Sequence, residues 1–169
     1  MKHRPAAIPR TLRTALWAAG VAIALAGCGS EEPVVKKDAL EAIAVGATAR
    51  LAALTDEKPD TACVLYPYHT TVEPNEPDST RINTALADAG YRGDEMEWTI
   101  VLASKAGVKY ASFRRTSGLD IMASHELRAE VQAMIPQGFT PSACAPASTA
   151  GFAKLVWHER TYLVFGHFD

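Results

Sequence analysis

The sequence predicts an α+β domain, in which three helices pack on a mainly antiparallel sheet of about four to six strands. Three observations support this fold class. Apolar residues recur at helical spacing in three stretches, β-branched and aromatic residues gather in several short runs, and some neighbouring runs are close enough to form hairpins. The expected order of elements is α-β-α-β-β-α-β-β, an order typical of helices packed against one sheet.

The first predicted helix covers approximately residues 35–54. Its apolar stripe, at steps of three or four, consists of Leu40, Ile43, Ala47, Leu51 and Leu54. Pro33 suits the start of a helix, whereas Gly46 in its middle costs about 1 kcal/mol relative to alanine. We expect the helix to end before the polar stretch at residues 56–59.

Residues 63–66 predict a short buried strand, and residues 69–78 predict a loop with two prolines and three acids. A second helix is expected to follow, capped by Asp78 or Ser79. Its apolar face consists of Ile82, Ala85, Leu86 and Ala89. Gly90 suits the C-terminal cap, because glycine adopts the left-handed backbone conformation without strain.

Residues 97–104 and 108–115 predict a β-hairpin, and residues 119–122 extend the sheet. Ser124 is expected to cap a third helix that ends at Pro136. The inward stripe of this helix consists of Leu127, Val131 and Met134.

Residues 137–150 show no periodicity and predict a long loop, of the kind that is usually functional or held in place by a crosslink. The chain then closes with aromatic and β-branched runs at 152–158 and 161–168. These predict a second hairpin, although neither residue of the Glu159-Arg160 turn is glycine or asparagine, the residues that such turns prefer.

The N-terminal stretch has the parts of a bacterial export signal. Its basic residues are Lys2, Arg4, Arg10 and Arg13, and no acid occurs before Glu31. An apolar run at residues 15–26 follows, which is shorter than the roughly 20 residues that a membrane span requires. The run ends within Leu25-Ala26-Gly27-Cys28, which resembles the lipobox of bacterial lipoproteins. A conventional signal with a free cysteine and a buried N-terminal helix are the alternatives.

The resemblance implies removal of residues 1–27, attachment of a diacylglyceryl group to the Cys28 thiol and acylation of the new amino terminus, for example with palmitate. Two or three acyl chains anchor a protein stably, since each buried CH₂ contributes about 0.8 kcal/mol. Residues 28–34 would then be a lipidated tether and residues 35–169 the globular domain. Gly29 stands where lipoproteins retained in the inner membrane carry aspartate, which favours the outer membrane, facing the periplasm.

Removal of the signal leaves 13 Lys and Arg against 19 Asp and Glu, so the remaining chain is acidic. This balance argues against a nucleic acid partner, which requires concentrated positive charge. Cys63 and Cys144 are the two other cysteines, and an exported protein matures where disulfides persist. We expect them to form one bridge; two buried or free thiols remain the alternative, and a zinc site would need more ligands.

The candidate binding surface consists of four basic residues of the first hairpin, namely Lys105, Lys109, Arg114 and Arg115. Such a cluster suits an anionic lipid or an acidic partner. The alternative is that these charges protect an edge strand from aggregation.

We identify no catalytic motif, metal site or cofactor site in the sequence. His69 precedes three acids in one loop, namely Glu73, Glu76 and Asp78, but the loop lacks the glycine and the oxygen-rich spacing of a calcium site. His125 and His158 are expected to be structural or surface residues.

The leading hypothesis is a non-enzymatic, lipid-anchored periplasmic protein that binds a protein partner as an inhibitor, immunity protein or envelope accessory factor. The alternative is a ligand-binding lipoprotein that holds a small molecule, lipid or peptidoglycan fragment. The third hypothesis is an unrecognised cell-wall hydrolase, which requires a histidine to meet a carboxylate or hydroxyl in a cleft.

Overall fold

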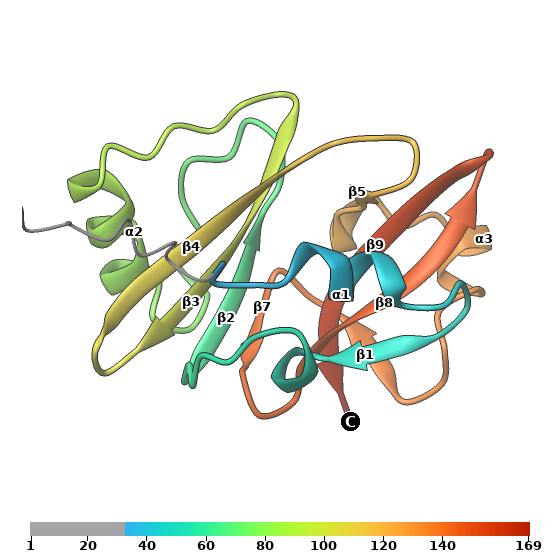
Figure 1. Cartoon of the computed structure of the whole chain (residues 1–169), viewed down its shortest axis with the longest axis horizontal. Helices are drawn as coiled ribbons and strands as arrows, with labels where there is room; N and C mark the ends of the chain where they lie inside the picture. The colour runs from blue at the N-terminus through green and yellow to red at the C-terminus, as the bar shows by residue number, and fades with distance from the viewer. Residues whose placement is uncertain (1–32) are drawn as a thin grey trace, which may run out of the picture. The chain divides into compact units, whose positions relative to one another are not determined.

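The computed structural model describes residues 33–169, which form an α+β domain (Figure 1). The predicted fold class is therefore confirmed. The strands lie in two sheets, and short strands that the sequence did not predict are added to the expected order. The predicted signal peptide, the lipidated Cys28 and most of the tether lie outside the described residues.

One sheet, the β2 sheet, is built on the predicted first hairpin and is antiparallel throughout. In the order β4-β3-β2-β7, its strands are Gly107–Arg114, Glu97–Ser104, Thr61–Leu65 and Cys144–Pro146. Strand β3 is buried on both faces along most of its length, which explains its almost continuous apolar sequence.

The other sheet, the β9 sheet, is built on the second predicted hairpin. Strands β8 (Ala150–Trp157) and β9 (Arg160–Phe168) pair antiparallel, with β1 (Thr48–Arg50) on the outer side of β8. Strands β5 (Asp120–Ile121) and β6 (Phe139–Pro141) both pair with β9, β5 in parallel. The turn is formed by His158 and Glu159, with φ of 47° and 62°, rather than by Glu159 and Arg160.

The alternation of side chains along the strands divides the core into three clusters. Between the two sheets, Trp98 packs with Phe113, Phe152 and other large side chains. The opposite face of the β2 sheet is covered by α2, and the opposite face of the β9 sheet is covered by the segment that contains α3 (Figure 1). The domain is therefore a two-sheet sandwich with α2 and α3 outside, which buries both faces of β2, β3 and most of β8.

The first predicted helix is wrong over most of its length. Residues 35–54 instead form α1 (Lys37–Ala42), the strand β1 and a 3-10 helix η1 (Leu51–Ala53). Gly46 has φ of 78°, which ends any helix there, and its N–H donates to the carbonyl of Lys154 at 2.7 Å. Pairing with β8 therefore outweighs the local helical pattern.

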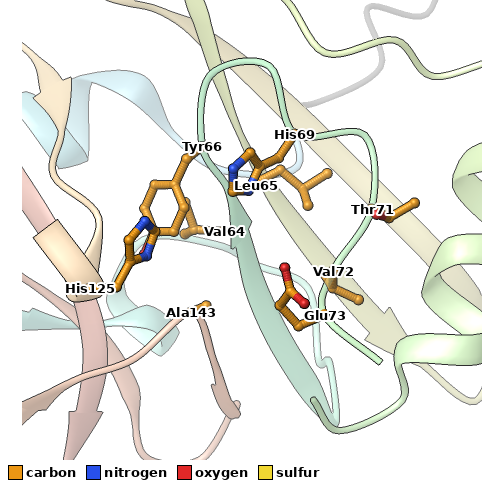
Figure 2. Close-up of a pocket in the computed structure, with 9 residues that line it drawn as sticks. All are labelled: Val64, Leu65, Tyr66, His69, Thr71, Val72, Glu73, His125 and Ala143. Carbon is orange, nitrogen blue, oxygen red and sulfur yellow. The ribbon is translucent and has the colours of Figure 1, made fainter. Parts of the chain in front are cut away.

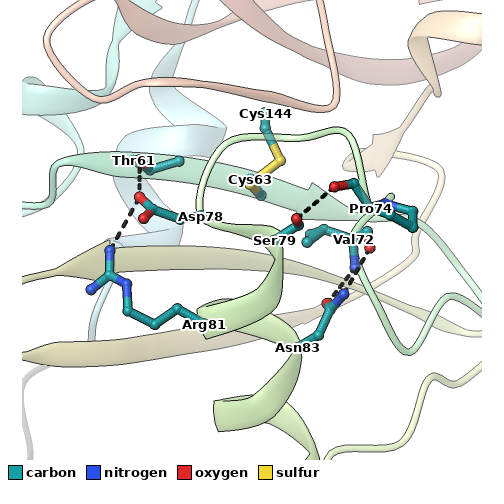
Figure 3. Close-up of a disulfide and its surroundings, with 9 residues drawn as sticks. All are labelled: Thr61, Cys63, Val72, Pro74, Asp78, Ser79, Arg81, Asn83 and Cys144. Carbon is teal, nitrogen blue, oxygen red and sulfur yellow. Dashed lines mark hydrogen bonds and ion pairs between the residues drawn. A yellow bond between two sulfur atoms is a disulfide. The ribbon is translucent and has the colours of Figure 1, made fainter.

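The second predicted helix is confirmed as α2 (Ser79–Asp88), and Gly90 follows it with φ of 67°. Asp78 occupies the N-cap position, but its carboxylate makes no capping bond. Its Oδ2 instead accepts a hydrogen bond from the Thr61 hydroxyl at 2.6 Å and pairs with Arg81 at 3.1 Å (Figure 3). Asp78 therefore ties α2 to β2.

The third predicted helix is also largely wrong. A 3-10 turn, η2 (Ser124–Glu126), is followed by the single turn α3 (Ala129–Gln132). In the adjoining predicted loop, β6 pairs with β9 and β7 pairs with β2, so the chain crosses from one sheet to the other at residues 142–143. Strand pairing with segments distant in sequence, which periodicity does not reveal, organises this part of the chain.

The predicted disulfide between Cys63 and Cys144 is present (Figure 3). The two cysteines are directly opposite each other on β2 and β7, with their Cα atoms 4.0 Å apart. Both are buried beneath α2. As predicted, the bridge attaches the 137–150 segment to the strand at residues 61–65.

Candidate binding groove

Three adjoining hollows form a groove where one end of the β2 sheet meets the β5 edge of the β9 sheet. Their volumes are about 60, 200 and 470 Å³. The first two share Tyr66, His69 and His125, and the last two share Arg115, Ile121 and Glu126. We call these three hollows together the groove, with a Tyr66 end and a Trp157 end.

The Tyr66 end is organised around one tyrosine at the end of β2. The imidazoles of His69 and His125 both lie beside its ring, each with a centroid distance of 5.9 Å and an edge-on orientation (Figure 2). The Tyr66 hydroxyl accepts a hydrogen bond from the backbone N–H of Ser124 at 3.4 Å, which fixes η2 beside β2. Burial raises the pKa of Tyr66, so this hydroxyl stays protonated at neutral pH.

The middle of the groove contains Arg115, which is held by a buried carboxylate. Its Nε and Nη2 lie 2.7 and 3.1 Å from the two carboxylate oxygens of Asp120, which is fully buried. Asp120 also pairs with Arg160 at 3.2 Å and accepts a hydrogen bond from the N–H of Ile121. The bond to Asp120 raises the pKa of Arg115 above its ordinary value, so the guanidinium is permanently charged and held in one orientation.

The Trp157 end combines aromatic, apolar and charged side chains. Arg128, which is exposed, lies over the ring of Trp157 with its Cζ 5.7 Å from the centroid. Tyr162 and the buried residues Ile121, Met122 and Val131 complete the walls. Glu126 adds one negative charge to a hollow that also contains Arg115 and Arg128.

The four basic residues of the predicted binding surface are dispersed. Lys105 and Arg114 lie at opposite ends of β4, about 20 Å or more apart at roughly 3.3 Å per residue. Lys109 is bound to Glu57 at 2.6 Å, and only Arg115 faces the groove. Arg114 lines a separate hollow of about 800 Å³ between α1 and β4, whose other members include Val35, Ala39 and Phe113.

Among the predicted histidines, the structure brings His69 and His125 together and places His158 in the tip of a hairpin turn. Neither groove imidazole makes a hydrogen bond or ion pair with another residue of 33–169. In the acidic loop, Asp78 is already bound to Thr61 and Arg81. No group of three or more metal-ligating side chains occurs in the described part of the chain.

The sequence pattern does not predict Tyr66, Arg128 or Trp157 as groove residues. The pairing of β5 with β9 and the position of η2 bring these residues together across about 90 positions of the chain. The sequence feature that points to this site is the repeated occurrence of histidine or arginine near aromatic residues. The sequence alone does not show that these side chains meet in one groove.

Comparison with protein-family models, with curated proteins and with solved structures gives no match to this chain. Within residues 33–169, no helix is long and apolar enough to cross a membrane.

Proposed function

We propose that this chain is a lipid-anchored protein of the cell envelope that binds a protein partner in the groove. The lipobox-like Leu25-Ala26-Gly27-Cys28 supports the anchor. The composition of the groove supports a protein partner: tyrosine, tryptophan and arginine are the residue types that contribute most to protein interfaces. They occur here as Tyr66, Tyr68, Trp157, Tyr162, Arg115 and Arg128.

The shape of the groove also favours a polypeptide. Several wall residues are exposed, including Tyr68, His69 and His125, and neighbouring hollows share wall residues. Small-molecule sites instead enclose most of the ligand and are predominantly apolar. The Asp120–Arg115 pair provides a rigid centre, which limits the entropy lost when a partner binds.

Site-specific photocrosslinking tests the proposal in cells. A benzophenone amino acid is placed at position 68, where the native tyrosine is 68% exposed beside the groove, or at position 45, where Val45 is 58% exposed on a loop outside it. We expect an adduct of defined mass from position 68 and none from position 45. Equal adducts from both positions, or none from position 68, would refute the groove as a partner site.

A double variant, His69→Ala with His125→Ala, provides the specificity control. Because neither imidazole is bonded to another described residue, the variant should fold normally while losing groove contacts. The yield of the position 68 adduct should fall severalfold. An unchanged yield would place the partner elsewhere on the surface.

A second candidate function is the binding of an apolar ligand between α1 and β4. The hollow there, about 800 Å³, lies within the range of ligand sites, and Val35 and Phe113 give it an apolar floor. Native mass spectrometry of protein purified from envelopes should then detect a bound molecule. Loss of the bound molecule in the Ala39→Trp variant would support this function. Wild-type protein without any bound molecule would contradict it.

A further inference from the structure

The Trp157 end of the groove combines two guanidiniums, of which that of Arg115 is held by Asp120, with a buried apolar wall. Arg115 is oriented by Asp120, and its Nη1 also donates to the carbonyl of Glu95 at 3.3 Å. One N–H on Nη1 and one on Nη2 of this 30% exposed side chain remain unused among the described residues. Arg128 lies on the face of Trp157, and its guanidinium makes no hydrogen bond to another described residue. Two arginines therefore present donors to the same hollow.

The charge at this end selects for an anion. Arg115 and Arg160 share the single buried charge of Asp120, which leaves one positive charge there. Arg128 adds a second, and Glu126 offsets one of them. The hollow therefore remains positive within a chain whose net charge is −2. Planar guanidiniums bind carboxylates with two parallel hydrogen bonds, which gives orientation as well as affinity.

The apolar wall restricts which carboxylate fits. Ile121, Met122 and Val131 are buried and adjoin the arginines in a hollow of about 470 Å³. In the last residue of a polypeptide, the carboxylate and the side chain are attached to the same carbon, so both can occupy one hollow. In aspartate or glutamate the side chain is itself the carboxylate and leaves the apolar wall unfilled.

We infer that the Trp157 end binds the C-terminal carboxylate of a partner polypeptide whose last side chain is apolar or aromatic. This inference rests on the proposed function, in that the partner is a protein. The carboxylate lies between Arg115 and Arg128, and the last side chain packs against Ile121, Val131 and the ring of Trp157. Glu126 opposes binding and thereby limits the affinity of the site.

Fluorine NMR of the lipidated chain, residues 28–169, labelled with 5-fluorotryptophan in detergent micelles, tests this inference. The probes are N-acetyl-Ala-Ala-Phe as the free acid and the same peptide as its C-terminal amide. We expect the acid to shift the Trp157 signal saturably and the amide to bind at least about tenfold more weakly, a difference of about 1.4 kcal/mol. Trp98 is fully buried and serves as the reference signal.

Three variants define the contacts. Arg128→Gln should weaken binding of the acid about tenfold, and Arg92→Gln, an exposed arginine outside the groove, should leave it unchanged. Glu126→Gln should strengthen binding about two- to fivefold, because it removes an opposing charge. A purely structural role for Glu126 would not produce this increase.

Equal binding of acid and amide, or no shift of the Trp157 signal by either, would overturn the inference. The result is distinguishable from failure of the proposed function. If the position 68 adduct forms while the peptide acid does not bind, the groove remains supported as a partner site and recognition of a C-terminal carboxylate is refuted. If the acid binds and the adduct is absent, the carboxylate site stands without the protein partner.

Discussion

Asp120 is the residue on which the middle of the groove depends most. It is fully buried, and its two oxygens are bonded to Arg115, Arg160 and the backbone of Ile121. A buried carboxylate is costly to desolvate, so it is stable there only because these partners compensate it. Through this one side chain, the end of β4, the strand β5 and the β8–β9 hairpin are held together.

We therefore predict that Asp120→Asn destabilises the domain by about 3–5 kcal/mol, the usual cost of breaking a buried ion pair. Urea denaturation followed by circular dichroism measures the loss. Asp56→Asn is the matched control, because Asp56 forms an exposed pair with Lys36 and its side chain is 70% exposed. That change should cost less than about 1 kcal/mol. Equal effects of the two substitutions would contradict the role of Asp120.

Asp78 makes the stability of the folded domain depend on pH in the acid range. Hydrogen bonding from Thr61 lowers the pKa of Asp78 below its ordinary value of 3.8. A carboxyl group whose pKa is lower in the folded than in the unfolded protein stabilises the fold at pH values above its unfolded-state pKa. This stabilisation is lost as the pH falls through the folded-state pKa. We predict that Asp78→Asn lowers the melting temperature at pH 6 and that the difference from wild type shrinks below about pH 4. A difference constant from pH 2 to 6 would contradict this.

At the scale of elements, local pattern predicted which residues are buried better than which structure they adopt. Leu40, Ile43, Leu51 and Leu54 are all buried, as the helical stripe required, but they lie in or directly after two separate elements, α1 and η1. Hydrogen bonds from Gly46 and to Ala47 join this segment to Lys154, more than 100 positions away. Periodicity contains no information on a pairing strand so distant in sequence. The pattern of residues 35–54 therefore predicts a helix where the strand β1 forms.

The hairpins and α2 were predictable because their bonds are local. Strands β3 and β4 are joined by two residues, and α2 has a complete apolar face and a C-terminal glycine. The groove was not predictable in the same way. The sequence predicts no role for His125 beyond a structural or surface one. Its position with His69 beside Tyr66 follows from the pairing of β5 with β9 and the position of η2.

The disulfide between β2 and β7 leads to a prediction about stability. Cys63 and Cys144 close a loop with a sequence separation of 81, which the chain-entropy model values at roughly 4–5 kcal/mol. The double substitution to alanine should lower the free energy of unfolding by up to that amount. Reduction of the unfolded wild type before refolding should give the same loss. Unchanged stability in the double variant would show that the bridge contributes little.

For the whole molecule, the distance between the proposed anchor and the folded chain limits where a partner is bound. Val35 is buried, and the carbonyl of Val34 accepts a hydrogen bond from the hydroxyl of Thr55. Val34 lies six positions after Cys28, and a fully extended chain covers only about 20 Å over six positions. If Cys28 is lipidated, the groove operates close to a membrane surface.

The anchor itself is the last prediction. Cys28→Ser should abolish incorporation of an alkyne-labelled palmitate and move the protein from the membrane fraction to the soluble fraction, because no thiol remains at the lipobox-like site. The Cys63→Ala and Cys144→Ala double variant is the matched control: it removes two cysteines and should keep both the label and the membrane fractionation. Label retained by Cys28→Ser would refute the proposed attachment site. If the position 68 adduct also disappears with Cys28→Ser, the partner is one that the anchored protein meets only at the membrane.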